Sequence, residues 1–235
     1  MSTTAGRTAL QASTVTAGST MWKRLLLLCG ALATVLYVAM DTVAALRYDG
    51  YSYLDQTISE LSAVDAPTRP MWIPLGVVYA LLMLAFSAGL WTVAGGRRSL
   101  RAIAALVAAI AIVGLVAWPF APMHQREVLA AGGGTFSDTL HIVLGLVDTV
   151  LFTSAIVIGA CAWRGGFRVY SIVTMVVLLV SGALTGMQGP RIDDNLSTPW
   201  LGVTERVALF ASMLWMAVLG IVLLREQAQA PPEET

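Results

Sequence analysis

The chain has 235 residues, of which 57% are hydrophobic and only 12% are charged, and its formal net charge is zero. A soluble domain usually carries charge on about a quarter of its residues, so the composition excludes an ordinary water-soluble protein and indicates a lipid bilayer as the main solvent. A neutral chain also lacks the basic surplus typical of nucleic-acid binding, so we expect membrane lipids and no nucleic acid as its partners.

The first 20 residues are rich in Thr, Ser, Ala and Gly and show no hydrophobic periodicity, which predicts a disordered tail. Six apolar stretches follow, each with the length of about 20 residues that a helix needs to cross a bilayer. Backbone groups in lipid must find their hydrogen bonds within the segment, so each stretch is predicted to be a helix. The stretches lie near residues 25–46, 72–94, 100–119, 139–162, 169–188 and 201–224.

The predicted fold class is therefore all-α: a polytopic bundle of six transmembrane helices in a single membrane domain, residues 21–225. Residues 226–235 are predicted to form a second disordered tail. Both tails are predicted to be cytoplasmic.

The basic residues are unequally shared between the two ends of the predicted bundle. Nine lie in the N-terminal tail, in the short connectors after the second and fourth helices, and after the sixth helix, whereas four lie in the other loops. Positive charge is typical of cytoplasmic loops, so the chain is predicted to be a multi-pass protein of the cell membrane with both termini cytoplasmic. The predicted outer loops are longer and hold most of the carboxylates, and we expect any chemistry there. Tryptophans are predicted to mark the outer interface: Trp72, Trp118 and Trp200.

The first outer loop contains the sequence SYLDQTISELSAVDAPTRP, residues 52–70. Its apolar residues recur at helical spacing, and Ser52-x-x-Asp55 fits an N-terminal capping box, so a short amphipathic helix is predicted in this loop. Two interpretations stay open. The helix is either a solvated element at the membrane surface or a lid that points Ser59 or Glu60 into a cavity.

The fourth predicted helix places Asp138, His141 and Asp148 on one face, because they are spaced at i, i+3 and i+10. With a rise of 1.5 Å per residue, Asp148 would lie about 15 Å inside the outer boundary, near the middle of the bilayer. A carboxylate at that depth costs at least a few kcal/mol unless it is protonated or paired. We therefore expect Asp148 to face the bundle interior and to have a functional role.

Other predicted helices also carry polar residues in apolar surroundings. Arg206 lies in or near the hydrocarbon and needs a partner, for which Asp41, Asp148 and Glu205 are the candidates. Asp41, Glu205 and Arg206 are accordingly candidate substrate-binding residues, with Arg206 as a clamp for an anionic group. The alternative is a buried network of salt bridges and hydrogen bonds that only fixes helix packing.

The sequence contains two histidines, His124 and His141, and both fall on the predicted outer side near Asp138. Two His and one carboxylate with an open position form an acceptable catalytic zinc set, so zinc is a possible cofactor. A capped or solvated histidine is the alternative interpretation. The sequence has no G-x-S-x-G elbow, phosphate-binding loop or H-E-x-x-H motif.

Four segments carry a resemblance to a known family: YDGYSYLDQTISELSAVDAPTRP after the first helix, WPFAPMHQ, TFSDTLHIVLG, and GVTERVALF in the last helix. Over roughly residues 25–224 the chain resembles the family called domain of unknown function 998, which consists of prokaryotic membrane proteins of about six helices. The resemblance implies an integral membrane protein without an established activity. It singles out Ser59, Glu60, His141 and Arg206.

Three functions stay open on this basis. The first is a membrane-embedded hydrolase or transferase that acts from the outer side on a lipid-linked substrate, with Ser59, Glu60 and Asp148 as catalytic residues and the candidate metal ligands holding a metal or activating water. The second is a non-catalytic binding or accessory protein. The third is a proton-coupled transporter of a small solute that uses Asp148 as the carrier.

Overall fold

The structure of the protein, a computed structural model, describes the backbone of residues 3–229 and the side chains of residues 21–229. Within this part the regular elements are all helical. The long helices are α1 (Thr3–Arg47), α2 (Arg69–Val93), α3 (Arg98–Ile112), α5 (Phe136–Ala162), α6 (Gly165–Gln188) and α8 (Leu201–Gln229). The short ones are η1 (Ile58–Ser62), η2 (Val113–Ala117), η3 (Trp118–Phe120), α4 (Arg126–Ala130) and α7 (Pro190–Asp193).

Six helical stretches are long and apolar enough to cross a membrane, and each overlaps one of the six predicted spans. They are Met21–Arg47, Arg69–Val93, Arg98–Phe120, Phe136–Ala162, Gly165–Asp193 and Leu201–Gln229. The predicted all-α fold with six membrane spans is therefore confirmed, and the chain is a multi-pass membrane protein.

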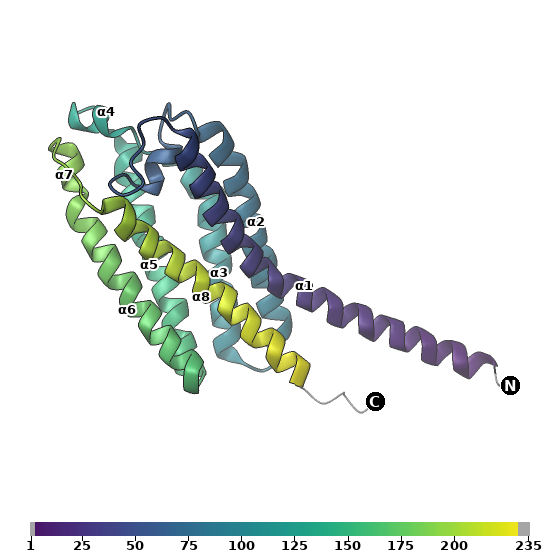
Figure 1. Ribbon diagram of the computed structural model, residues 1–235. Coiled ribbons are helices and arrows are strands. Elements are labelled where there is room, and N and C mark those ends of the chain that lie inside the picture. Colours follow the sequence, from purple (N-terminus) through teal and green to yellow (C-terminus); the bar gives the residue numbers. More distant parts are fainter. Residues whose placement is uncertain (1–2, 230–235) are drawn as a thin grey trace.

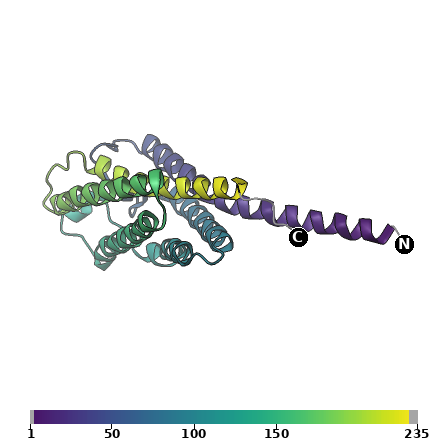
Figure 2. The same cartoon turned by 90° about the horizontal axis from the view of Figure 1, so that it is seen from below.

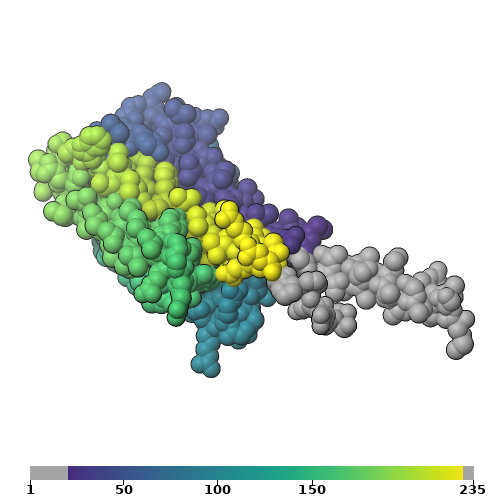
Figure 3. Space-filling model, turned by 60° about the horizontal axis from the view of Figure 1, so that its bottom comes forward, coloured from purple at the N-terminus to yellow at the C-terminus, as the bar shows by residue number. Residues whose placement is uncertain are grey.

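The six long helices form a closed ring in which each contacts the next, in the order α1, α2, α3, α5, α6, α8 and back to α1. Figures 1 and 2 show this arrangement from two directions. In the space-filling view α8 lies between α6 and α1 along one face (Figure 3). Half of the apolar window of α8 is buried, against a third or less in the other spans, so α8 is the most enclosed helix.

Apolar packing fills much of the ring. Phe86 of α2 lies against Gly30 of α1 and Gly220 of α8, where the absence of a Cβ lets the helices approach closely. Trp215 of α8 lies against Gly159 of α5 in the same way, and its indole N–H donates to Ser171 Oγ at 2.9 Å. Large apolar side chains that point away from the ring are exposed, as expected for surfaces that face lipid.

The ends of the chain differ in part from the expectation. Helix α1 begins at Thr3, so residues 3–20 are helical where a disordered tail was expected. This segment contains no proline, so nothing interrupts the helix that enters the first span. Helix α8 extends to Gln229, into the second expected tail. The remainder of that tail, residues 230–235, and residues 1–2 lie outside the described residues.

Candidate functional site

The segment between α1 and α2, residues 48–68, folds over the end of the ring that lies away from the two chain termini (Figure 1). We call it the cap loop. It contains η1, whose capping box is formed by Thr57 and Glu60 and not by the predicted Ser52 and Asp55. The helix is shorter than its apolar pattern suggested: it begins at Ile58, which is 2% exposed, and leaves out the preceding apolar position, residue 54, which is half exposed.

Arg206 of α8 joins the cap loop to the ring. Its Nε and Nη2 bind the two oxygens of Asp41 on α1 at 3.0 and 2.9 Å. Its Nη1 donates to the carbonyl oxygens of Tyr53 and Gln56 at 3.0 and 3.1 Å, and its Nη2 also donates to the Tyr51 hydroxyl at 2.7 Å. Asp41 is fully buried and Arg206 is 3% exposed. Each nitrogen of this guanidinium therefore already has an acceptor, which is the signature of an internal anchor.

Two tyrosines of the cap loop complete this anchor. The Tyr53 hydroxyl donates to Asp41 Oδ2 at 2.8 Å, and the Tyr53 ring lies 3.7 Å from the guanidinium carbon of Arg206. The Tyr51 hydroxyl donates to the carbonyl oxygens of Gln56 and Thr57. Burial raises the pKa of both phenols, and the hydrogen bond to Asp41 raises the pKa of Tyr53 further. Both tyrosines are therefore neutral donors at physiological pH.

A second anchor ties the cap loop to α4. Arg126 binds Glu60 with both Nε and Nη2, each at 2.8 Å from a carboxylate oxygen, and this pairing raises the pKa of the guanidinium. Gln56 Nε2 donates to Glu60 Oε2 at 2.7 Å, and the Thr57 N–H donates to Glu60 Oε1 at 2.9 Å. The Thr57 hydroxyl also donates to Glu60 Oε1 at 3.2 Å. This predicted catalytic residue is 3% exposed and is held by five donor groups from the cap loop and α4.

Between the two anchors, the cap loop brings Ser59 to α5. Ser59 Oγ lies 2.8 Å from His141 Nε2, and His141 Nδ1 lies 2.9 Å from the carbonyl oxygen of Ala121. A carbonyl oxygen can only accept a hydrogen bond, so the proton of the neutral imidazole is on Nδ1. Nε2 is then an acceptor, and the Ser59 hydroxyl donates to it.

Glu205 of α8 flanks this pair from the other side. Its Oε1 lies 3.5 Å from Ser59 Oγ, and its Oε2 accepts the N–H of Ile58 at 2.5 Å. The backbone N–H of Ser59 itself has no acceptor among the described residues. Ser59, His141 and Glu205 are all half-buried. A hydroxyl bound to a histidine that a third group orients is the arrangement of an activated nucleophile.

Asp148 lies two helical turns from His141 on α5 and does not contact Ser59. Its Oδ2 accepts the indole N–H of Trp118 at 3.0 Å, and the Trp118 ring meets the imidazole of His141 edge-on, with 4.7 Å between the ring centroids. Asp148 Oδ1 is buried and has no hydrogen-bond partner within the described part of the chain. The predicted orientation of Asp148 toward the other helices of the bundle agrees with this contact.

The three predicted metal ligands are not brought together. Asp138 accepts the backbone N–H of His124 at 2.7 Å and lies 2.8 Å from His124 Nδ1, and it also caps α5 through Thr135. His141 is turned toward Ser59 instead. Among residues 21–229, no three His, Cys, Asp or Glu side chains gather closely enough to hold a metal ion. The predicted zinc set is therefore not assembled, because Asp138 contacts His124 whereas His141 contacts Ser59 and Ala121.

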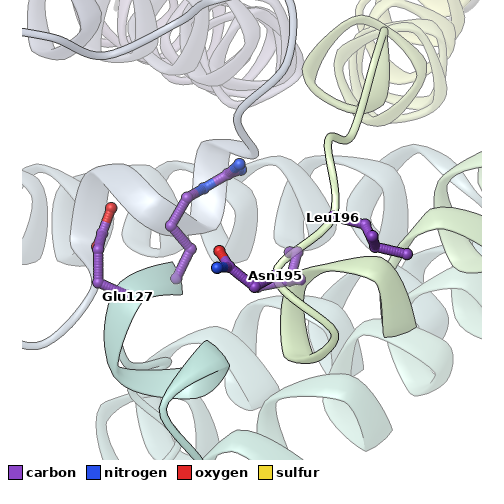
Figure 4. A pocket seen from close by; sticks show the side chains of 5 residues that line it. Glu127, Asn195 and Leu196 are labelled. Atoms are coloured by element: carbon purple, nitrogen blue, oxygen red, sulfur yellow. The ribbon is translucent and has the colours of Figure 1, made fainter.

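A polar cleft opens beside the cap loop. It has a volume of about 450 Å³ and is lined by Gln56, Arg126, Glu127 and Thr198, among others. A smaller hollow of about 60 Å³ is also lined by Arg126 and Glu127, and its other wall includes Asn195 and Leu196 from the segment that follows α7 (Figure 4). Gln56 and Arg126 both bind Glu60, the residue after Ser59, but Ser59 itself does not line the larger cleft.

The sequence identified the main ionisable residues of this region but missed three features. No motif in the sequence singles out Arg126 or Ala121, and Trp118 is predicted only to mark the outer interface. Ala121 acts through its backbone carbonyl, which no residue pattern reveals. The pairing of Asp41 with Arg206 was among the expected alternatives.

A comparison with models of protein families agrees with the family resemblance of the four sequence segments. The model of a family described as "Protein of unknown function (DUF998)" matches residues 31–222, and the chain therefore belongs to that family. No curated protein and no solved structure matches the chain.

Proposed function

We propose that this member of the family is a membrane-embedded hydrolase or transferase that cleaves an ester bond of a lipid-linked substrate, with Ser59 as nucleophile and His141 as general base. The observation that supports the proposal is the 2.8 Å contact between Ser59 Oγ and His141 Nε2, with His141 Nδ1 held by Ala121. Nucleophile, base and orienting group then stand in the order required for covalent acyl transfer.

In the proposed reaction Ser59 Oγ attacks the ester carbonyl carbon while its proton passes to His141 Nε2. The resulting oxyanion takes the free N–H of Ser59 as one donor. When the intermediate collapses, the imidazolium returns the proton to the departing alcohol and the acyl group stays on Ser59. Water or a second alcohol then attacks the acyl carbon while its proton passes to His141 Nε2. When this second intermediate collapses, the imidazolium returns that proton to Ser59 Oγ, and the acyl group leaves as an acid or a new ester.

The surroundings of Ser59 support a substrate that is partly in the membrane. The site lies at one end of a ring of membrane-spanning helices. The polar cleft of about 450 Å³ is lined by Gln56 and Arg126, which both bind Glu60, the residue after Ser59. Arg206 and Arg126 are both paired with carboxylates, so the cleft offers hydroxyls, amides and carboxylates and no free guanidinium. We propose that the cleft holds an uncharged or cationic headgroup, in place of the anionic group suggested for Arg206 by the sequence.

We also propose that the cap loop lies outside the cell membrane and that both termini are cytoplasmic, because basic residues are concentrated at the opposite end of the ring. Cys161 is exposed near the end of α5 on that side. A membrane-impermeant maleimide should label Cys161 in opened membranes and leave it unlabelled in intact cells, with Cys161→Ser as the control. Labelling of Cys161 in intact cells would reverse the proposed orientation.

A fluorescent fluorophosphonate, which reacts with activated serine hydroxyls, tests the proposed activity. The purified wild type should be labelled, Ser59→Ala should lose the label, and His141→Ala should react more slowly by about 10²-fold or more, the usual contribution of a general base. Ser62→Ala is the matched control, because Ser62 lies in the same short helix and its hydroxyl only donates to the carbonyl oxygen of Ser59. Equal labelling of Ser59→Ala and wild type would refute the proposal.

A further inference from the structure

Trp118 connects the Ser59–His141 pair to a carboxylate deeper in the bundle. We propose that Asp148 is a positioning residue that acts through Trp118 to hold His141 in the tautomer that accepts the Ser59 proton. This inference rests on the proposed function for its catalytic meaning. Its structural part, the control of the His141 tautomer, is measurable without any activity.

The first step of the argument is the way in which His141 is held. The segment Trp118–Ala121 contacts the imidazole twice: the Ala121 carbonyl accepts from Nδ1 at 2.9 Å, and the Trp118 ring packs edge-on against the imidazole at an interplanar angle of 78°. Both contacts come from one short segment, so the imidazole and this segment must move together. A displacement of Trp118–Ala121 would remove the acceptor that selects the Nδ1–H tautomer.

The second step concerns how that segment is itself held. It follows η2, a π-helical turn over Val113–Ala117, and contains Pro119, so its backbone is not fixed by a continuous α-helical ladder. The side-chain hydrogen bond from Trp118 Nε1 to Asp148 Oδ2, at 3.0 Å, ties the segment to α5. Asp148 and His141 lie on the same helix, so one bond fixes Trp118–Ala121 relative to the imidazole.

The third step is the chemistry that Asp148 needs for this role. Only Oδ2 is used, and it serves as a hydrogen-bond acceptor; Oδ1 has no partner in the described region. An amide oxygen can accept the same indole N–H, so asparagine should keep the role, whereas leucine should abolish it. A proton carrier or a charged catalytic group would instead be lost in both variants.

Nitrogen NMR of the protein with ¹⁵N-labelled histidine gives the direct test, since the chain has only two histidines and a His124→Asn variant assigns the signals of His141. Wild type, Asp148→Asn and the control Thr149→Val should show His141 as a single Nδ1–H tautomer. Thr149 is adjacent to Asp148 and its hydroxyl only donates within α5. Asp148→Leu should show both tautomers.

Trp118→Phe removes the same hydrogen bond from the other side while it keeps an aromatic ring beside His141, so it serves as the test if Asp148→Leu does not fold. It should also show both tautomers. A single Nδ1–H tautomer in the variant that lacks the bond, or mixed tautomers in Asp148→Asn, would overturn the inference.

Labelling kinetics with the fluorophosphonate separate this inference from the proposed function. Asp148→Leu should lower the maximal rate constant of Ser59 labelling at least tenfold while the concentration for half-maximal rate stays unchanged, and Asp148→Asn should react at nearly the wild-type rate. If the wild type is not labelled at Ser59, the proposed function fails, and the tautomer measurement still decides the role of Asp148.

Discussion

Removing one partner of the buried pair of Asp41 and Arg206 should cost more stability than breaking any other ion pair described here. Replacing Asp41 with leucine leaves a guanidinium that is 3% exposed without its carboxylate. Removing one partner of a buried ion pair typically costs about 3–5 kcal/mol, because the remaining charge stays desolvated and uncompensated. We expect a similar loss for Arg206→Met, which leaves the Asp41 carboxylate with only the Tyr53 hydroxyl as a donor and leaves the Tyr53 carbonyl without its donor.

The double variant Asp41→Leu/Arg206→Met separates charge from packing. It removes both charges, and the main remaining cost is the Tyr53 carbonyl, which has lost its donor, and the Tyr53 hydroxyl, which has lost its acceptor, about 1–3 kcal/mol each when such groups stay buried. The two single losses together would be roughly 6–10 kcal/mol if they were additive. The free energy of unfolding of the double variant should therefore fall by much less than that sum.

The assay is unfolding of the purified protein in mixed detergent micelles, followed by circular dichroism. The control is Glu226→Ala, which breaks the Arg97–Glu226 pair near the other end of the ring, where the two side chains are 44% and 40% exposed. This exposed pair should contribute about 0–1 kcal/mol. Single variants at Asp41 and Arg206 that stay within the range of this control, or a double variant that loses the full additive sum, would refute the reasoning.

Two further predictions concern the fit of the cap loop. Gly202→Ala should destabilise the protein by about 1–3 kcal/mol in the same assay, because the new Cβ would collide with two carbonyl oxygens of the cap loop, whereas Gly186→Ala, with no atom within 4 Å of its Cβ, should leave stability nearly unchanged. Glu60→Gln should loosen the contact with Arg126 and increase deuterium uptake in the cap loop, measured by hydrogen-exchange mass spectrometry; unchanged uptake there would contradict the role assigned to this pair.

The sequence predicted the fold well because each span is a long apolar run that only a helix can satisfy in lipid. It also identified Ser59 and His141 separately, one from the first outer loop and one from the fourth predicted helix. It did not pair them, since their contact joins residues 82 positions apart and depends on where the chain turns after α3.

The errors of interpretation at the site have the same origin. His141 was grouped with Asp138 as a metal ligand because the two are three residues apart, but spacing fixes a helix face and not the partner that the face meets. Arg206 was a candidate anion clamp, since its charge is visible in the sequence and its five acceptor residues are not. The role of Trp118 depends on an indole N–H that reaches α5, which no pattern in α3 indicates.

The central claim, that Ser59 is an activated nucleophile, is tested most directly by locating the adduct after reaction with the fluorophosphonate. The labelled protein is digested and the modified peptide is sequenced by mass spectrometry. The account predicts one phosphonylated residue, Ser59, and little or no adduct in His141→Ala under the same conditions. An unmodified Ser59, or an adduct at Ser59 that forms equally fast without His141, would contradict it.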